Sequence, residues 1–243
     1  MKKELAVGLA FCAIVTAAVM PSSAQALDLD EVEVGVVTGA SWNILGEPLD
    51  PADSYTFLWG SAFTGPGALF GANAVLELAE VEGASIALSA DLLYGYHRGT
   101  GYADHQYGGR IDVQLSTHVL RFPLMLRVKN AATETGPTLG VGVEPIFGIR
   151  SAATVELTGL DHPVLPVYTT PTATVAGVVE LGFDIDLDDY IVPLGARVSL
   201  NPFMPASTEE RFDGFSSPES PGEYQVGFDV QFMLTAGVRW DLN

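Results

Sequence analysis

The last twenty residues, 224–243, alternate between apolar and polar or small side chains over a length that few folds accommodate. Every second residue from Tyr224 to Leu242 is apolar, and glutamine, aspartate, threonine, glycine and arginine lie between them. A period of two predicts an extended strand with one apolar and one polar face. Soluble strands usually span about 3–10 residues, whereas a tilted strand crossing a bilayer needs about 9–11 and can project beyond it. The pattern therefore predicts the closing strand of an outer-membrane β-barrel.

The end of this segment resembles the C-terminal signal that bacterial barrel-assembly machinery recognises in its clients. Thr235 supplies the polar residue, Gly237 follows two positions later, and Trp240 and Leu242 supply the aromatic and apolar positions. Clients usually end on the last aromatic residue, whereas Asn243 ends this chain. The alternative is an edge strand of a soluble sandwich. A long apolar edge would favour aggregation, so the barrel is preferred.

The first 26 residues have the organisation of a secretory signal peptide. Lys2 and Lys3 precede an apolar run over 5–20, and a Pro-Ser-Ser-Ala-Gln-Ala segment ends at Ala26, the expected cleavage site. Cys12, the only cysteine, lies inside this segment, so the mature chain has no thiol. We therefore expect a signal peptide over 1–26 and a single barrel domain over 27–243.

Charge and hydropathy together narrow the class of protein. Loss of Lys2, Lys3 and Glu4 changes the formal charge from −19 by −2 and +1, to −20. Such an acidic chain is a poor nucleic-acid binder, because phosphate contacts need Lys and Arg. Mean hydropathy is nevertheless +0.27 and 48% of residues are hydrophobic. No mature segment approaches 18 consecutive apolar residues, and the remaining way to satisfy a backbone in lipid is a closed barrel.

The whole mature chain divides into eight alternating segments. They are predicted over 32–44, 68–79, 85–97, 110–128, 136–150, 171–183, 190–201 and 224–243. Three short connections, 80–83, 130–135 and 184–189, alternate with long ones, as in Gram-negative outer-membrane barrels with short periplasmic turns and long external loops. The predicted fold is all-β, an eight-stranded antiparallel up-and-down transmembrane β-barrel. Aromatic residues form two expected girdles: Trp42, Phe70, Tyr94 and Tyr96 near the outer rim, and Phe183, Tyr190 and Trp240 near the inner one.

The fourth segment contains an irregularity in its alternation. Ile111, Val113 and Leu115 are apolar at odd positions, whereas Leu120 and Phe122 continue the apolar set at even positions. A change of parity within one strand predicts a β-bulge between Ser116 and Val119.

Two segments resemble a known family. Residues 119–127, Val-Leu-Arg-Phe-Pro-Leu-Met-Leu-Arg, are similar to an aromatic-Leu-Glu-Ile-Pro-Leu-Leu-Leu-Lys segment of the small outer-membrane β-barrel domain family, which includes PorT-like proteins. Residues 136–142, Gly-Pro-Thr-Leu-Gly-Val-Gly, resemble the Pro-Tyr-Leu-x-x-Gly strand of that family, with Val119 in place of the aromatic residue and Arg121 in place of the acid. The resemblance implies an eight-stranded outer-membrane barrel and supplies no shared catalytic residue.

The polar faces of the segments carry both signs of charge. The residues expected inside are Glu33, Glu77, Asp91, Arg110, Asp112, Arg121, Arg127, Glu144, Glu180, Arg197, Asp229 and Arg239. An eight-stranded barrel has room inside only for side chains, so we expect a lumen filled by ion pairs. The register around the 130–135 turn predicts Arg127 opposite Thr138 and an interior pair between Arg121 and Glu144, with a structural role.

Candidate sites for chemistry are weak. None of the four histidines, His97, His105, His118 and His162, lies in a motif with a fixed serine spacing. His97 and His105 flank the second long loop near Asp104, where we expect a solvated pair of loop residues and no enzyme. The 184–189 turn lacks the glycine and glutamate of a calcium loop, and no metal or cofactor site is expected. The last loop, with Glu209, Glu210, Asp213, Glu219 and Glu223, could bind divalent ions that bridge to surface glycolipid, or it could dock a partner protein.

The sequence favours an outer-membrane barrel with a filled lumen, long acidic external loops and a structural or interaction role at the cell surface. Its expected partners are outer-membrane lipid and, during biogenesis, the barrel-assembly machinery. A small-solute channel and a secreted lipocalin-like ligand-binding barrel are the alternatives. The lipocalin would point its apolar faces inward instead of outward.

Overall fold

The computed structural model describes residues 32–44, 57–59, 63–105, 109–133, 135–159, 168–203, 212–213 and 223–241. The predicted signal peptide and Leu242 lie outside these ranges. The strands are β1 (Val32–Ile44), β2 (Phe57–Trp59), β3 (Thr64–Val81), β4 (Ala84–His105), β5 (Arg110–Arg121), β6 (Leu124–Asn130), β7 (Gly136–Thr158), β8 (Tyr168–Pro171), β9 (Ala173–Asp186), β10 (Ile191–Leu200), β11 (Phe212–Asp213), β12 (Glu223–Val226) and β13 (Val230–Asp241). Within these ranges, no helix is long and apolar enough to cross a membrane.

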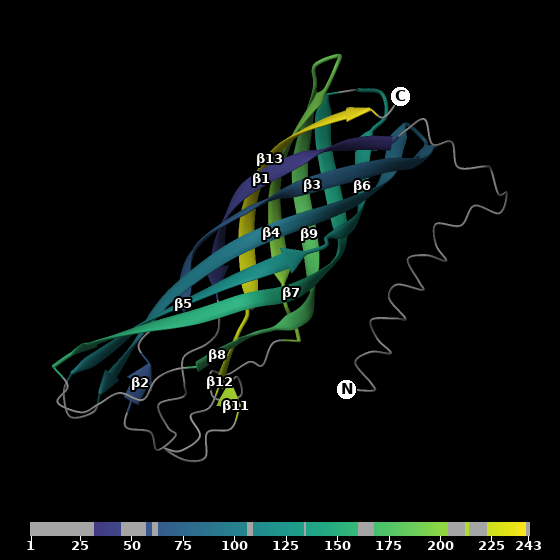
Figure 1. Cartoon of the computed structure of the whole chain (residues 1–243). Coiled ribbons are helices and arrows are strands. Elements are labelled where there is room, and N and C mark those ends of the chain that lie inside the picture. Colours follow the sequence, from purple (N-terminus) through teal and green to yellow (C-terminus); the bar gives the residue numbers. More distant parts are fainter. Residues whose placement is uncertain are drawn as a thin grey trace, which may run out of the picture.

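The long strands form a closed antiparallel ring (Figure 1). β1 pairs with β3 and β13, and the order continues from β3 through β4, β5 with β6, β7, β9 and β10 back to β13. β5 and β6 are one strand, because the ladder continues past Pro123: its carbonyl accepts from Asp91 N at 3.0 Å, and Phe122 N donates to Pro145 O at 2.9 Å. Counting them together, the described residues form an eight-stranded up-and-down barrel, which confirms the predicted fold class.

The short connections lie at one end of the ring, where Val32 and Asp241 also lie (Figure 1). The β3–β4 connection is tighter than the predicted four residues. Glu82 and Gly83 both have positive φ, 51° and 82°. This matches the two-residue hairpin turn whose twist suits antiparallel strands. At the opposite end lie β2 and the small sheet of β8, β11 and β12.

The barrel is apolar outside and charged inside. Leu234 is 69% exposed, Leu181 65% and Phe70 60%, whereas Arg121, Glu144 and Gln231 are 0% exposed. A soluble protein has the reverse arrangement, with charged residues outside unless they are paired. The predicted direction of both faces is therefore correct for β13 from residue 231 onward, where Gln231 points inward and Phe232 outward.

The parity change in the fourth segment is not a bulge in that strand, so this prediction is wrong. The β4–β5 register runs without a shift from Leu93↔Arg121 to Asp104↔Arg110. What changes is the environment: Val113 and Leu115 are buried inside at 4% and 1% exposure, while Gln114 points outward. The register shift found nearby lies in β7, where Ile149 is the extra residue between Val119↔Gly148 and His118↔Arg150.

Two residues expected inside therefore lie outside. Arg110 and Asp112 form an ion pair on the outer surface at 2.7 Å, with side chains 48% and 42% exposed. They occupy the part of β5 where the apolar side chains are inside and the polar ones outside. An unbroken strand in a changing environment explains the pattern without any backbone irregularity.

Several strands are longer than expected. β4 continues to His105, β7 to Thr158 and β9 to Asp186, so parts of the predicted connections 99–109, 151–170 and 184–189 are strand. The sequence prediction stopped where the outward face ceased to be apolar. β4 and β7 instead continue beyond that point with exposed polar residues such as Thr100 and Thr154, whereas β9 keeps its polarity, with Asp184 buried inside.

The single strand expected over 224–243 is interrupted, so that prediction is wrong. β12 pairs in parallel with β8, outside the ring, and β13 begins only at Val230. Between them the chain turns inward at Gly227 and Phe228, and Phe228 is 2% exposed. The alternation in the sequence continues through this break because Phe228, which points inward, and Phe232, which points outward, are both apolar residues at even positions.

Candidate functional site

The interior toward the turn end contains a network of ion pairs. Arg197 contacts Asp91 at 2.5 Å and also Glu180, and Arg127 lies 3.3 Å from Glu180. Arg239 contacts Asp184 at 2.5 Å and Glu33 at 2.9 Å. The carboxylate oxygens and guanidinium groups are charge-assisted partners, the strongest hydrogen bonds available to side chains. The network joins β1, β4, β6, β9, β10 and β13 across the lumen.

Asp184 was expected in a turn, yet it is one of the central residues of this network. It is 5% exposed and contacts both Arg127, at 3.4 Å, and Arg239. Asp184 has the same parity as Glu180 and Gly182, both predicted to face inward. The alternation of the sixth segment, extended by one step, would have placed it inside.

A second polar cluster lies farther toward the loop end, around Arg121. Arg121 Nη2 donates to Glu144 Oε2 at 2.6 Å, and Ser199 Oγ donates to the same oxygen at 2.6 Å. Arg121 also contacts Gln231, which in turn contacts Asn43 and lies 3.0 Å from His97 Nδ1. The sequence reasoning did not single out Asn43, Ser199 or Gln231, because uncharged polar residues on inward faces carry no signal beyond their parity.

The Arg121–Glu144 contact forms with a register different from the one expected. Arg121 stands directly opposite Ile146, and Arg127 opposite Gly140 rather than Thr138. The offset is two residues, so the same faces remain inside. Arg121 reaches Glu144 along the diagonal, and Arg127 Nη2 still donates to Thr138 Oγ1 at 3.1 Å. Long arginine side chains tolerate this displacement because diagonal neighbours lie about 7–8 Å apart.

An apolar layer separates the two polar clusters. Val37, Leu69, Leu93 and Met233 pack together at exposures of 0–7%. At the loop end the interior becomes apolar again, and Phe63, Val113, Leu115, Val226 and Phe228 are all at most 4% exposed. Phe228 packs over Arg121, with the guanidinium carbon 5.1 Å from its ring centre. The described lumen is therefore filled from end to end by side chains of alternating polarity.

His97 does not lie on a solvated loop, so this expectation is wrong. It is 0% exposed within the barrel, 3.4 Å from Ser41 Oγ, and its ring meets Phe228 at 6.3 Å. Its parity along β4 directs it inward, like Asp91 and Leu93. The side chains of Asp104 and His105 and all of His162 lie outside the described residues, and His118 lies on the outer surface against Tyr94 and Tyr96.

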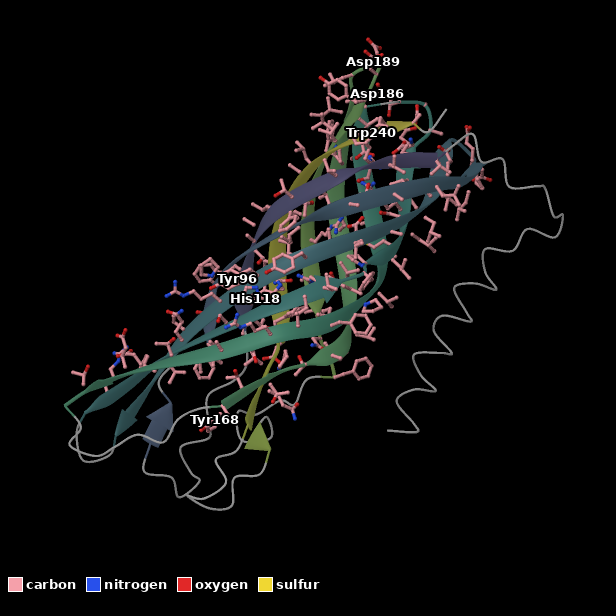
Figure 2. The ribbon with its side chains drawn as sticks, in the orientation of Figure 1. Tyr96, His118, Tyr168, Asp186, Asp189 and Trp240 are labelled. Carbon is pink, nitrogen blue, oxygen red and sulfur yellow. The ribbon has the colours of Figure 1, made fainter. Side chains whose placement is uncertain are left out.

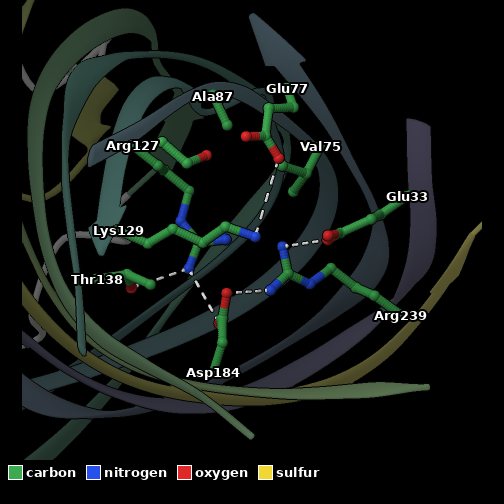
Figure 3. A pocket seen from close by; sticks show the side chains of 10 residues that line it. Glu33, Val75, Glu77, Ala87, Arg127, Lys129, Thr138, Asp184 and Arg239 are labelled. Atoms are coloured by element: carbon green, nitrogen blue, oxygen red, sulfur yellow. Dashed lines mark hydrogen bonds and ion pairs between the residues drawn. The ribbon is translucent and has the colours of Figure 1, made fainter. Parts of the chain in front are cut away.

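A small polar cavity opens among the ion pairs at the turn end (Figure 3). It measures about 20 Å³ and is lined by Glu33, Glu77, Arg127, Lys129, Asp184 and Arg239, among others. A water molecule needs at least about 10–15 Å³ on this measure, so the space suits about one water. It holds no solute the size of a sugar or amino acid.

The remaining predicted residues lie elsewhere in the barrel or outside the described ranges. Thr235, Gly237 and Trp240 of the assembly signal lie in β13, with Trp240 43% exposed on the outside (Figure 2). Glu77 lies at the turn end, near Lys129 at 4.0 Å. The side chains of Asp213 and Glu223 and all of Glu209, Glu210 and Glu219 lie outside the described residues.

No protein-family model and no curated protein matches the sequence. Solved structures of outer-membrane proteins are among those similar to this chain. The outer membrane protein OprG from Pseudomonas aeruginosa is 11% identical, covers 90% of this chain and 100% of its own, and has a TM-score of 0.38. Ail, the attachment invasion locus protein of Yersinia pestis, is represented by two structures, each of which covers 86% of this chain and 99% of its own. The complex of Ail with the heparin analogue sucrose octasulfate is 12% identical and has a TM-score of 0.27. The second structure of Ail is 10% identical and has a TM-score of 0.24. The barrel assignment itself rests on the strand pairing of this chain.

Proposed function

We propose that this protein is a resident barrel of the outer membrane with a closed lumen and a structural or interaction role at the cell surface. The observation that carries the proposal is the inverted polarity of the ring: exposed leucines and phenylalanines outside, ion pairs inside. Patches of exposed apolar surface beyond a few hundred Å² are rare on soluble monomers. A closed ring satisfies its backbone without water, as lipid requires. The same polarity argues against the secreted lipocalin-like alternative.

The height of the apolar belt supports this location. Trp42 and Trp240 are 52% and 43% exposed, and Trp240 pairs with Val34, eight residues from Trp42 along β1. Eight residues rise roughly 27 Å along a strand, or about 19–22 Å along the axis at a tilt of 35–45°. The apolar band of such barrels is about 25 Å tall. Interfacial aromatic residues therefore bracket a belt of suitable height.

The strands that continue beyond the belt support a role at the cell surface. β4 and β7 have 22 and 23 residues, whereas crossing a bilayer needs about 9–11. Their loop-end halves are polar outside, and β5 between them contributes the buried Val113 and Leu115 inside, the arrangement of a water-exposed β-structure. The barrel would thus carry a folded, water-facing extension above the membrane, which offers a surface for contact with other molecules.

The filled lumen favours this role over that of a solute channel. Four buried arginines, 121, 127, 197 and 239, face the carboxylates of Glu33, Asp91, Glu144, Glu180 and Asp184. Because the positive and negative charges are paired and nearly equal in number, they give the lumen no net field that would select ions of one sign. Their side chains also fill the space that a solute would need. We also propose no catalytic role. Ser41 and His97 touch, but at 7% and 0% exposure neither meets a substrate.

Cell fractionation combined with gel mobility tests the location. We expect the mature chain in the outer-membrane fraction, migrating faster unheated than boiled because the closed barrel stays compact in detergent. Recovery in the periplasmic or soluble fraction without detergent would contradict the proposal. An acyl-hydrolysis assay of the wild type against His97→Gln, with both confirmed as folded by mobility, tests the catalytic question. Activity that depends on His97 would overturn the non-catalytic role.

A further inference from the structure

The outer surface of β4, β5 and β7 changes character at the loop-end edge of the apolar belt. Outward residues that pair across these strands form successive rows: Tyr94, Leu120 and Phe147; Tyr96, His118 and Arg150; Arg98, Ser116 and Ala152; Thr100, Gln114 and Thr154; Tyr102, Asp112 and Glu156. Each row lies two residues, roughly 7 Å along the strands, beyond the one before it. The first row belongs to the belt, and the later rows are polar.

Basic and acidic side chains lie at different distances from the belt along these rows. The second and third rows contain Arg98, His118 and Arg150, and no carboxylate. The first carboxylates, Asp112 and Glu156, occur in the fifth row, roughly 14 Å beyond the third. In a chain with 30 acidic and 11 basic residues, this acid-free basic patch directly above the belt is unusual. Arg98 and Arg150 are both exposed, and Arg98 donates to Gln114 in the next row.

Aromatic side chains surround the basic patch on its membrane side. Tyr94 and His118 are in contact, with Oη 2.5 Å from Nδ1, and the rings of Tyr96 and His118 are 5.0 Å apart. Phe70 packs against Tyr94 at 5.3 Å. Figure 2 shows Tyr96 and His118 together on the outside of the barrel. Tyrosine rings at this position are typical of the boundary between acyl chains and headgroups.

We infer that Arg98, His118 and Arg150 bind the phosphate groups of a phosphorylated lipid headgroup at the membrane surface. Arginine presents planar pairs of donors that match phosphate oxygens. The patch lies one to two rows above the belt, at the level where headgroup phosphates lie. The carboxylates are displaced to heights where they do not repel that phosphate. The inference rests on the proposed membrane location.

Binding of lipid A to the folded chain in detergent micelles, followed by native mass spectrometry, tests this site. The probes are bisphosphorylated lipid A, the same lipid with its phosphates removed, and inorganic pyrophosphate. We expect bisphosphorylated lipid A to bind the wild type at least about tenfold tighter than the dephosphorylated form, the scale of one charge-assisted contact. Pyrophosphate should not compete at equal concentration, since it has no acyl chains to lie against the belt.

Variants locate the contact. Arg150→Gln should weaken binding of the phosphorylated lipid about tenfold, and Arg98→Gln with Arg150→Gln should abolish the preference for phosphate. Arg98→Lys with Arg150→Lys should restore part of it. The matched control is Arg110→Gln, which removes one exposed charge eight residues above the His118–Arg150 row along β5. Binding should change less than about twofold because salt screens charges at that distance.

The outcomes separate this inference from the proposed function. A chain that gives no heat-modifiable, folded species in micelles overturns both. A folded chain that binds both lipid forms equally, keeps its preference in the double Gln variant, or prefers free pyrophosphate overturns the lipid site alone.

Discussion

At the scale of single residues, the buried charges dominate the energetics. Arg121 and Glu144 are both fully buried and share contacts with Ser199 and Gln231. Removal of one partner leaves an uncompensated charge in a medium that solvates it poorly. Replacement of both by apolar residues removes that penalty and is often nearly neutral.

We therefore expect Glu144→Gln to lower the free energy of unfolding by about 3–5 kcal/mol, because Arg121 loses its charged partner. Chemical denaturation in lipid vesicles, followed by tryptophan fluorescence, measures the change. Arg121→Met with Glu144→Leu should recover much of the loss. The exposed Arg110–Asp112 pair is the control, and Asp112→Asn should cost at most about 1 kcal/mol. An unchanged stability in Glu144→Gln would contradict the buried pair.

Two glycines separate conformational cost from steric cost. An added methyl group meets nothing within 4 Å at either Gly83 or Gly177, but Gly83 has φ +82°. Gly83→Ala should therefore destabilise the barrel by about 1 kcal/mol or more, since L-residues with a side chain rarely adopt this φ. Gly177→Ala should be neutral or slightly stabilising in the same unfolding assay. Equal effects at both positions would argue against the positive-φ turn.

At the scale of strands, the strands that extend beyond the belt have two polarity zones, and the boundary between the zones marks the edge of the belt. β13 and the turn-end half of β7 are apolar outside, with Leu234 69% and Val141 55% exposed. The loop-end half of β7 is polar outside, with Arg150, Ala152, Thr154 and Glu156. A charge should thus be tolerated at one end of a strand and rejected at the other.

We expect Leu234→Arg to cost about 2–4 kcal/mol, the range found for cations near the bilayer midplane, whereas Thr154→Arg should stay within about 0.5 kcal/mol of wild type. Reversible unfolding in vesicles measures both. Comparable costs at the two positions would mean that the belt does not meet lipid at Leu234.

Alternation in the sequence predicted each strand well where one environment acts along its whole length. β1, from Val32 to Ile44, matches the predicted range because its outward face stays within the belt and is apolar except at Thr38. β5 and the 224–243 segment were misread because periodicity reports which side chains are apolar, not whether apolar means outside. Phe228 is the clearest case: it has the parity of the belt residues but packs inside against Arg121. Tertiary surroundings decide this, and a single strand pattern does not contain them.

At the scale of the whole molecule, the eight-strand count and the closed ring were predictable from the alternation of short and long connections. For the interior residues, the sequence predicted which face of each strand points inward, but not which residues stand opposite each other on neighbouring strands. The two-residue error in the β6–β7 register came from the turn, whose geometry no periodicity encodes. The partners of Asp184 and Gln231 could be identified only from the structure, where neighbouring strands bring them together.

The filled interior predicts electrical silence. Two ion-pair clusters and an intervening apolar layer of Val37, Leu69, Leu93 and Met233 occupy the lumen. We expect no discrete conductance steps when the refolded protein is added to planar bilayers. A known porin inserted in the same membranes serves as the positive control. Reproducible single-channel steps from the pure protein would favour the solute-channel alternative.

Because β1 pairs with β13, the first and last strands of the ring are neighbours, and the ring would keep the same strand pairs if the chain began at another strand. Glu33 and Asp241 are register partners, so a short peptide could join these positions, and the backbone could instead be opened between Glu82 and Gly83. Such a circular permutant would contain every neighbour relation of the natural ring. The strand pairing of the closed barrel therefore does not depend on which strand comes first in the sequence.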